Sequence, residues 1–323
     1  MKVFVTGATG FIGFHLCQRL VADGHSVVAL VRDPKKATDL PSAVERFQGD
    51  LGRLDAPELV LPACDVVIHL AGVVSAQNPD EYHATNFEAV KGLVRCLERQ
   101  SWRPRRMLFA SSLAAAGPSM AARRMTEADP SAPVEPYGRA KLDAEAFLAG
   151  APFPTTSFRP AIVFGPRDTA TLSFFKMAKQ GWGFRVAGQP QALSFIDVDD
   201  LVSGIVAMMD DTSAAHHVYF VSALEDTDSA QLWKALAEVI GRRVRIVAVP
   251  RAVLRIASLL STGLSKVFRF RNQLDGKQYT QLTAPAFLCS SDALQKAHAW
   301  RPRVGLSASL GKAWAGYRES GWV

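Results

Sequence analysis

Short runs of apolar residues alternate with amphipathic stretches along the first half of the chain. The runs are rich in Val, Ile and Leu and lack polar alternation, which is typical of strands covered on both faces. These predicted strands are residues 3–6, 26–31, 44–48, 65–70 and 107–110. The stretches between them carry apolar residues at helical spacing and predict helices at 11–22, 34–40 and 80–100. Repeated strand–helix units predict an α/β fold with a doubly wound parallel sheet of Rossmann type.

The second half keeps this alternation only in part. A helix at 136–148 and a strand at 155–159 continue it, and 195–209 and 218–221 read as a helix and a strand returning to the main sheet. A smaller region follows, with predicted elements at 231–240, 245–249, 251–260 and 306–319. We therefore expect a Rossmann domain at 1–165, joined by 195–221, and a smaller C-terminal substrate-binding cap made of 166–194 and 222–323.

A glycine-rich turn joins the first predicted strand to the first helix. Its sequence is Thr6-Gly7-Ala8-Thr9-Gly10-Phe11-Ile12-Gly13. The three glycines permit a tight turn, close approach of the backbone to a pyrophosphate and close packing of the helix on the sheet. The strand–turn–helix context separates this motif from an ordinary glycine-rich turn. The residues expected to bind a dinucleotide here are Gly7, Thr9, Gly10, Phe11, Ile12 and Gly13.

The end of the second predicted strand bears on the choice of cofactor. NAD enzymes usually place a carboxylate there for the adenosine ribose hydroxyls. Here the strand is followed by Arg32-Asp33-Pro34-Lys35-Lys36. Arg32, with Lys36 behind it, suits a ribose 2′-phosphate, which predicts NADP(H) as the preferred cofactor. Two alternatives stay open: Asp33 turned inward would favour NAD(H), and the basic residues could be solvated loop charges.

Tyr137 and Lys141 stand four residues apart at the start of a predicted helix and so share one face. The Lys141 ammonium would favour a phenolate and lower the pKa of Tyr137 from its usual ~10. Such a tyrosine can exchange a proton with a carbonyl or alcohol oxygen. Ser111 and Ser112 follow the strand at 107–110, at the carboxyl edge of the sheet, where ligands of open α/β folds bind. Taken singly, these residues would also fit an ordinary helix pair and turn serines.

Further motifs follow one another in a definite order. After the glycine turn come Asp50-Leu51, His69-Leu70-Ala71-Gly72, Ser112, Tyr137-x-x-x-Lys141, Arg159-Pro160 and the segment 195–200. In this set and order the chain resembles extended short-chain dehydrogenases/reductases, the superfamily of sugar-nucleotide epimerases, dihydroflavonol reductases and 3-beta-hydroxysteroid dehydrogenases. The resemblance spans nearly the whole chain, including the closing residues 317–322.

The resemblance implies roles for the matching residues. Tyr137 would be the general acid or base, Ser112 would orient the substrate oxygen, and Lys141 would hold the nicotinamide ribose. Asp50 and Leu51 would flank the adenine. The remaining nucleotide contacts that it implies are Leu70, Ala71, Gly72, Val73, Ser111, Pro160 and Val163.

Two features bear on the substrate. Ala116-Gly117 stands where many members of the superfamily carry Tyr-Gly, which speaks against a sugar nucleotide. The expected substrate-side segments contain the apolar or aromatic residues Phe164, Leu172, Phe174, Phe175, Trp182 and Phe184, and the basic residues Arg167, Lys176 and Arg185. We predict an NADP(H)-dependent oxidoreductase acting on a lipophilic ketone or secondary alcohol. The alternatives are a sugar-nucleotide epimerase or dehydratase that retains NAD, and a nucleotide sensor without chemistry.

Composition narrows the choice of partners and location. The net charge of +7 favours anionic partners, but no recognition motif accompanies the dispersed basic residues, so we expect no nucleic acid. The four cysteines and the histidines are scattered, which predicts a reduced, cytoplasmic protein without a metal. The chain starts with a strand and contains no run of ~18 apolar residues, so we expect neither a signal peptide nor a membrane span.

The segment 251–271 stands out because it is basic and amphipathic. It contains five Lys and Arg residues and no acid. This pattern predicts either peripheral contact with an anionic membrane or a cap helix whose basic side is solvated. The apolar faces of 80–100 and 136–148 likewise suit either a homodimer interface or packing within one chain.

Overall fold

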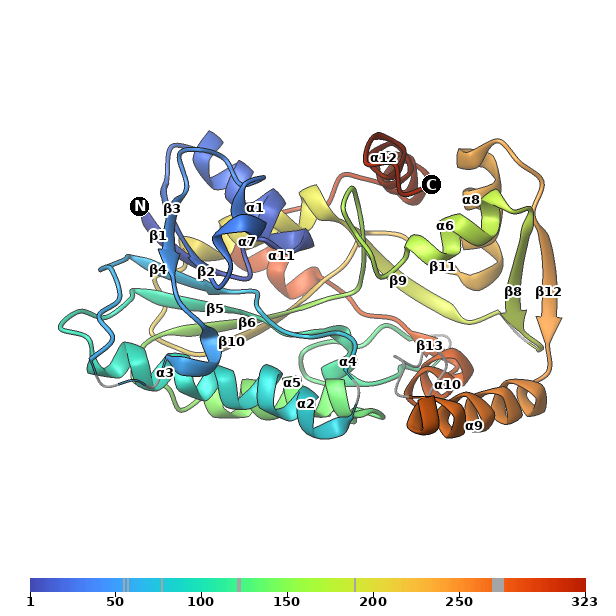
Figure 1. The fold of residues 1–323 in the computed structure, drawn as a ribbon, viewed down its shortest axis with the longest axis horizontal. Coiled ribbons are helices and arrows are strands. Elements are labelled where there is room, and N and C mark those ends of the chain that lie inside the picture. The colour runs from blue at the N-terminus through green and yellow to red at the C-terminus, as the bar shows by residue number, and fades with distance from the viewer. Residues whose placement is uncertain (55, 57, 77, 121–122, 189, 269–275) are drawn as a thin grey trace.

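A seven-stranded parallel sheet forms the larger part of the molecule (Figure 1). The computed structural model describes residues 1–323 except 55, 57, 77, 121–122, 189 and 269–275, and leaves the side chains of 36, 262–268 and 276–278 undescribed. The strand order is β10-β6-β5-β4-β1-β2-β3, and every neighbouring pair is parallel. The strands are β1 (Lys2–Thr6), β2 (Ser26–Val31), β3 (Glu45–Gln48), β4 (Val66–His69), β5 (Arg106–Ala110), β6 (Thr155–Pro160) and β10 (His217–Val221). The predicted Rossmann-type sheet is confirmed.

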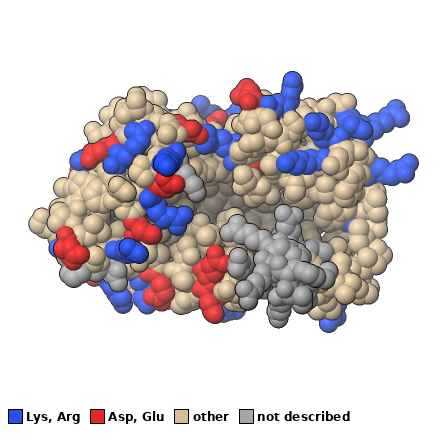
Figure 2. Space-filling view, viewed as in Figure 1, with Lys and Arg blue, Asp and Glu red and all other residues tan. Residues whose placement is uncertain are grey.

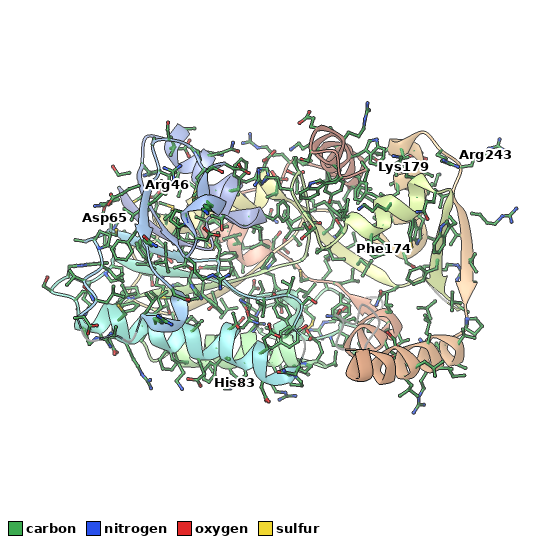
Figure 3. The ribbon with its side chains drawn as sticks, viewed as in Figure 1. Arg46, Asp65, His83, Phe174, Lys179 and Arg243 are labelled. Carbon is green, nitrogen blue, oxygen red and sulfur yellow. The ribbon has the colours of Figure 1, made fainter. Side chains whose placement is uncertain are left out.

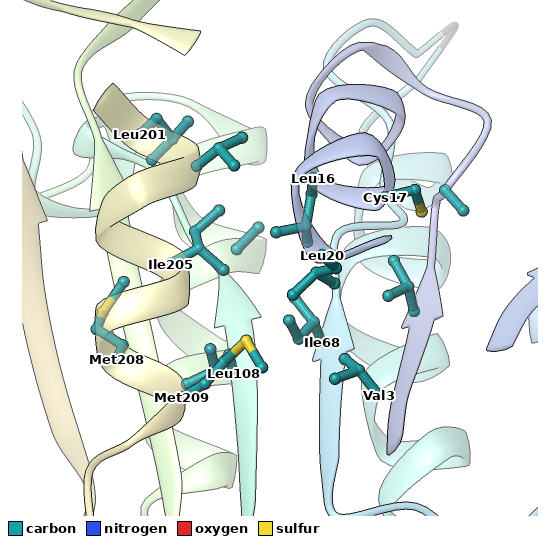
Figure 4. Packing of buried hydrophobic residues seen from close by; sticks show 14 of the residues in the cluster. Val3, Leu16, Cys17, Leu20, Ile68, Leu108, Leu201, Ile205, Met208 and Met209 are labelled. Atoms are coloured by element: carbon teal, nitrogen blue, oxygen red, sulfur yellow. The ribbon is translucent and has the colours of Figure 1, made fainter. Parts of the chain in front are cut away.

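Helices cover both faces of this sheet. Val3 and Val5 of β1 pack in a cluster with α1 (Phe11–Ala22) and α7 (Val198–Met209). Figure 4 shows Leu20 of α1 and Ile205 of α7 turned toward one another over the strands. Phe4, which points to the other face, packs in a cluster with α3 (Ala89–Arg99) and α5 (Pro136–Leu148). Burial on both faces explains why these strands are apolar at successive positions.

Three predicted helices differ from those in the structure. Residues 34–40 form only a short 3-10 turn, Pro34–Ala37, so the helix predicted there is wrong. The helix predicted at 80–100 is present as α2 (Pro79–His83), a π-helical turn Ala84–Glu88, and α3. The helix predicted at 195–209 begins only at Val198, because 195–197 end strand β9 (Ala192–Asp197).

The second half of the chain adds two smaller sheets. β9 pairs with β7 (Ile162–Phe164), β11 (Asp226–Asp228) and β13 (Ala286–Phe287), and β8 (Trp182–Val186) pairs with β12 (Arg245–Val249). The helices of this half are α6 (Leu172–Lys179), α8 (Ser229–Ile240), α9 (Arg251–Phe268), α10 (Gly276–Thr283), α11 (Asp292–His298) and α12 (Leu306–Glu319); a short α4 (Leu113–Ala116) follows β5.

A separate apolar cluster ties α6, α8 and α12 together around Phe175, Trp233 and Tyr317. The Trp233 indole N–H donates to the Phe184 carbonyl oxygen of β8 at 2.7 Å.

Among the helices that the structure describes, none is long and apolar enough to cross a bilayer. Figure 2 shows a hollow between the part that carries the main sheet and the part built by the smaller sheets.

Candidate active site

The glycine-rich turn packs tightly against the loop after β4. Gly7 has a φ of +75°, and a Cβ there would lie 2.6 Å from the Ala71 nitrogen, so only glycine fits. The Gly10 N–H donates to the Gly7 carbonyl oxygen at 3.0 Å and closes the turn. Helix α1 then begins at Phe11 without a side-chain cap and without an acid in its first turn. The first N–H groups of α1 are thus left for an anion, which fits the pyrophosphate of a dinucleotide.

The turn after β2 exposes Arg32, which has no hydrogen bond or ion pair with any residue that the structure describes. The Asp33 carboxylate accepts the Lys35 N–H at 3.1 Å and caps the 3-10 turn. Asp33 therefore already serves the backbone, whereas the Arg32 guanidinium has its donors free for a phosphate. The Lys36 side chain, also predicted to bind the cofactor, lies outside the described residues.

Asp50 and Leu51 lie at the end of β3, two strands from β1 along the same edge of the sheet. Both are half-buried. The Asp50 carboxylate accepts the Gly52 N–H at 3.0 Å and caps the turn Leu51–Arg53. Parallel strands bring these residues and the glycine turn to one edge, where an adenine next to a pyrophosphate would lie.

Asn86 fixes the loop after β4, and the sequence analysis missed it. Its amide oxygen accepts the Val73 N–H at 3.1 Å, and its amide nitrogen donates to the Val73 carbonyl oxygen at 3.0 Å. Asn86 lies in the π-helical turn and is fully buried. The sequence does contain a sign that Asn86 is buried. Asn86 precedes the buried Ala89 and Val90 by three and four residues, so it continues the apolar face of α3.

The structure brings Ser112 and Tyr137 into contact. The Ser112 hydroxyl caps α4 by accepting the Ala114 N–H at 3.1 Å, and it is also hydrogen-bonded to the Tyr137 phenol. A Cβ on Gly138 would lie 2.2 Å from the Ala114 carbonyl oxygen, so glycine allows α5 to approach α4 this closely. Glu135, missed in the sequence, caps α5 by accepting the N–H groups of Tyr137 and Gly138, both at 3.0 Å.

Lys141 lies on the same side of α5 as Tyr137 and is buried. Its Nζ donates to the Ala110 carbonyl oxygen at 2.7 Å and lies 4.7 Å from the centre of the Phe109 ring and 5.9 Å from that of Tyr137. The same nitrogen is 3.2 Å from the point where a side chain on Gly72 would begin. Lys141 therefore lies close to both Tyr137 and the loop after β4.

Burial controls the protonation of both groups. It raises the pKa of Tyr137 to about 12, an effect that the Ser112 hydrogen bond partly offsets. It lowers the pKa of Lys141 to about 7, against the attraction of Glu145. The expectation that Lys141 lowers the tyrosine pKa is therefore wrong for the polypeptide by itself, because desolvation by burial, together with the nearby Glu135 and Tyr82, raises that pKa. Tyr137 is protonated at neutral pH and suited to donate a proton.

The Ser111 hydroxyl has a buried partner on α5. It donates to the Glu145 carboxylate, which also forms a buried ion pair with Arg159 at 2.5 Å. Glu145 was missed in the sequence, although it follows Lys141 by four residues on the same helix. The Ser111 side chain thus has a buried partner within the chain, and its predicted nucleotide contact stays a prediction.

Pro160 ends β6, and Val163 lies in β7 directly beyond it. Pro160 is buried and Val163 half-buried. Both therefore lie past the carboxyl end of β6, the neighbour of β5, from which Ser112 emerges. The nicotinamide contacts expected of these two residues stay a prediction.

A cavity of about 580 Å³ lies among the smaller sheets and α8, α9 and α10. Its wall is mostly apolar, with Phe174, Phe184 and Trp233 among its members, and two guanidinium groups, Arg185 and Arg251. Figure 3 shows Phe174 between the main sheet and β8. Of the apolar residues singled out in the sequence, Phe174 and Phe184 line this cavity.

The other predicted substrate-side residues have different places. Phe164 and Phe175 are buried in the core, and Trp182 is exposed. Arg167 packs over the Phe14 ring and pairs with Asp39 at 2.9 Å. These residues serve packing and surface contacts, so only part of the predicted apolar set reaches the cavity.

Helix α10 connects the cavity to the tyrosine site. The Gln281 amide nitrogen lies 3.4 Å from the Glu135 carboxylate, which caps the helix that carries Tyr137. The next two residues of α10, Leu282 and Thr283, line the cavity. The cavity wall and the tyrosine turn are therefore in contact through one helix.

The sheet order and the arrangement of Ser112, Tyr137 and Lys141 beside the glycine turn define an extended short-chain dehydrogenase/reductase. Within that class, the chain belongs to the NAD dependent epimerase/dehydratase family, whose model matches residues 3–222.

Relatives within this family include both reductases and epimerases. The ceramide reductase of Caulobacter vibrioides is 28% identical over 77% of this chain and 73% of its own. A farnesyl-dihydroquinoline-oxide ketoreductase of Stigmatella aurantiaca is 27% identical over 82% and 80%. An uncharacterised UDP-glucose epimerase of Bacillus subtilis is 25% identical over 76% and 84%.

Solved structures show the same fold. The UDP-glucose 4-epimerase of Thermotoga maritima superposes with a TM-score of 0.79 at 20% identity, over 99% of both chains. The UDP-glucose 4-epimerase of Thermus thermophilus, in complex with NAD, gives a TM-score of 0.78 at 22% identity, over 98% of this chain and 99% of its own. At these identities the likeness concerns the architecture.

Proposed function

We propose that the protein is an NADP(H)-dependent oxidoreductase that interconverts a lipophilic ketone and its secondary alcohol. The observation that carries this proposal is the contact, through α10, between the Ser112–Tyr137 pair and an apolar cavity. A proton donor beside an apolar chamber suits a carbonyl carried on a hydrophobic body. Two relatives named as reductases, for a ceramide and for a farnesylated quinoline oxide, support this substrate class.

The residues of this chain would handle the proton. The nicotinamide cofactor, when bound, supplies a hydride to the carbonyl carbon. Ser112 and Tyr137 would hydrogen-bond the carbonyl oxygen, and Tyr137 would give it the phenolic proton. The raised pKa of Tyr137 keeps that proton in place at neutral pH until negative charge develops on the oxygen. Lys141, next to Gly72, would bind the nicotinamide ribose.

The preference for NADP(H) rests on Arg32. Its guanidinium is exposed and has no partner among the described residues, while the neighbouring Asp33 caps a turn. The two smaller sheets, with 166–194 and 222–323, would act as the substrate-binding cap over a nucleotide domain at 1–165 and 195–221.

The first experiment identifies the cofactor. The purified protein is denatured to detect any retained nucleotide, and the empty protein is titrated with NADPH and NADH by fluorescence. A charge-assisted hydrogen bond contributes about 1.5–3 kcal/mol, so Arg32→Glu should weaken NADPH binding by roughly 10- to 100-fold and leave NADH binding nearly unchanged. Lys179→Glu, an exposed charge on α6, is the matched control. Tightly retained NAD⁺ would overturn the proposal.

The second experiment tests the proton donor. Tyr137→Phe should lower kcat for reduction of a ketone by about 10²–10⁴-fold while NADPH binding is retained. Tyr219→Phe, a buried tyrosine on β10, controls for the loss of a phenol elsewhere. Full activity of Tyr137→Phe would mean that the chemistry uses another group.

A sugar-nucleotide epimerase that retains NAD is the second candidate. The observation in its favour is the pair of guanidinium groups in the cavity wall, Arg185 and Arg251, which could bind a diphosphate. Binding of UDP-glucose to the purified protein by calorimetry, lost in Arg185→Gln, would favour it over the reductase.

A further inference from the structure

Helix α9 exposes an apolar face to solvent. Its exposed side chains are Val253 at 52%, Ile256 at 59%, Leu259 at 66% and Leu260 at 63% of their full area. Leu254 and Ser258, on the opposite side, are only 6% and 4% exposed. At about 100° per residue, the exposed apolar positions span an arc of roughly 120°. The helix therefore attaches to the body by one side and presents the other to its surroundings.

The exposed apolar area is concentrated in this part of the molecule. Thirteen large apolar side chains are exposed within the described residues, and six of them fall between 246 and 260. The other two, Ile246 and Val247, lie on β12, the strand that precedes α9 at the end of the molecule farthest from the main sheet (Figure 1). An exposed apolar helix face of this kind marks a binding surface. We call Val253, Ile256, Leu259 and Leu260 the docking face.

Positive charge borders the docking face. Arg255 lies next to Leu259 on the helical projection, Arg251 lies one turn before Arg255 on the same side, and both are exposed. Residues 251–268 contain no acid, and β12 begins with the exposed Arg245. A second copy of this chain would bring the same positive charge to the contact, which disfavours self-association. An anionic surface with an apolar interior complements both the charge and the side chains.

The docking face adjoins the proposed substrate cavity. Arg251, the first residue of α9, lines the cavity and donates to the Thr283 carbonyl oxygen of α10 at 3.3 Å. α9 and α10 thus form part of the cavity wall, and α10 continues to the tyrosine turn through Gln281. A bilayer on the docking face would lie on the outer side of α9, the helix whose first residue lines the cavity.

We propose that the docking face seats the protein on an anionic lipid bilayer, from which a lipophilic substrate passes into the cavity. The membrane contact is inferred from the exposed surface alone, whereas the delivery of substrate rests on the proposed reductase function. Apolar side chains would enter the interface between headgroups and acyl chains, and the bordering arginines would contact lipid phosphates.

Co-sedimentation with vesicles tests the contact. The probes are vesicles of phosphatidylcholine alone and of phosphatidylcholine with a quarter of phosphatidylglycerol, at low and at high salt. We expect binding to the anionic vesicles that weakens as salt rises. Ile256→Ser with Leu260→Ser should reduce the partition coefficient by about tenfold or more, since each removes an apolar side chain from the interface. Val60→Ser with Leu224→Ser, equally exposed but outside the docking face, is the matched control.

The proposal would be overturned by no binding to anionic vesicles, by equal binding to both vesicle types, or by equal binding of the docking-face variant and the wild type. A wild-type dimer in analytical ultracentrifugation that the docking-face variant dissociates would likewise assign this surface to a second copy. Circular dichroism of each variant confirms that it is folded.

Measurements of ketone reduction distinguish a failure of the membrane proposal from a failure of the proposed reductase function. With NADPH, the docking-face variant should reduce a short, water-soluble methyl ketone at the wild-type rate. It should reduce a long-chain methyl ketone embedded in anionic vesicles at least severalfold more slowly. Vesicle binding without reduction of either ketone would refute the reductase and leave the membrane contact standing. Reduction of both at unchanged rates in the variant would refute the delivery of substrate from the membrane.

Discussion

Glu145→Gln should both destabilise the protein and change the titration of Lys141. The Glu145 carboxylate pairs with the Arg159 guanidinium, and these two side chains are only 5% and 6% exposed. It also accepts the Ser111 hydroxyl and raises the pKa of Lys141 against the effect of burial. Glutamine keeps the shape of the side chain and removes its charge, so Arg159 is left as an unpaired buried cation.

The size of the stability loss follows from that burial. Removing one partner of a buried ion pair costs about 3–5 kcal/mol. At ~2 °C per kcal/mol for a chain of this size, the melting temperature should fall by roughly 6–10 °C in differential scanning fluorimetry. The pKa of Lys141 should fall further below about 7, because the attraction of the carboxylate is lost. The decline of kcat/KM for ketone reduction that follows deprotonation of Lys141 should therefore begin at a lower pH.

A double variant separates the two effects. Glu145→Leu with Arg159→Met removes both buried charges, so most of the stability should return. The change in the pH profile should persist, because Lys141 still lacks the carboxylate four residues away. A double variant with a wild-type pH profile would show that the Glu145 charge does not act on Lys141. An unchanged melting temperature in Glu145→Gln would refute the argument from the ion pair.

Two further substitutions test the geometry of the site. The pKa of Lys141 is about 7 in the folded chain and ~10.4 unfolded, so between these values the unfolded chain binds the extra proton and the wild type gains stability as pH rises. Lys141→Met should abolish this gain in stability, which amounts to about 4 kcal/mol in all. Chemical denaturation of the wild type and the variant at pH 7 and pH 10 measures it. The same pH dependence of stability in both proteins would refute the prediction. Gly138→Ala places a Cβ 2.2 Å from the Ala114 carbonyl oxygen and should separate Ser112 from Tyr137. It should lower kcat by at least about tenfold with NADPH affinity unchanged; wild-type kcat would show that the contact between α4 and α5 is not needed.

The pattern of apolar residues was sufficient for the main sheet. All seven of its strands were expected, because strands buried on both faces leave uninterrupted apolar runs. The pattern failed where a run was short. Residues 34–40 end before Pro41, which disfavours helical backbone at Leu40 and leaves room only for a 3-10 turn. Phe195 and Ile196 fit a strand as well as a helix, and the pairing of β9 with β7 decides between them.

The residues of the candidate site likewise include some that the sequence predicted and some that it did not. Ser112, Tyr137 and Lys141 were predicted because their spacing occurs in the sequence within an ordered set of motifs that resembles extended short-chain dehydrogenases/reductases. Asn86 and Glu145 were not, since their importance depends on partners in other elements, the Val73 backbone and the Arg159 guanidinium. A polar residue on an apolar helical face shows that some buried partner exists, and the tertiary structure alone says which one it is.

The π-helical turn Ala84–Glu88 also has a meaning for protein engineering. Because its wider winding carries Asn86 to the Val73 backbone, the loop after β4 and this helix form a single transplantable module. A chimaera that took residues 84–88 from a relative with a regular helix at this point would leave the Val73 N–H without its acceptor. Recombination libraries built on this scaffold should therefore place their crossovers before β4 or after α3, and exchange the whole unit at once.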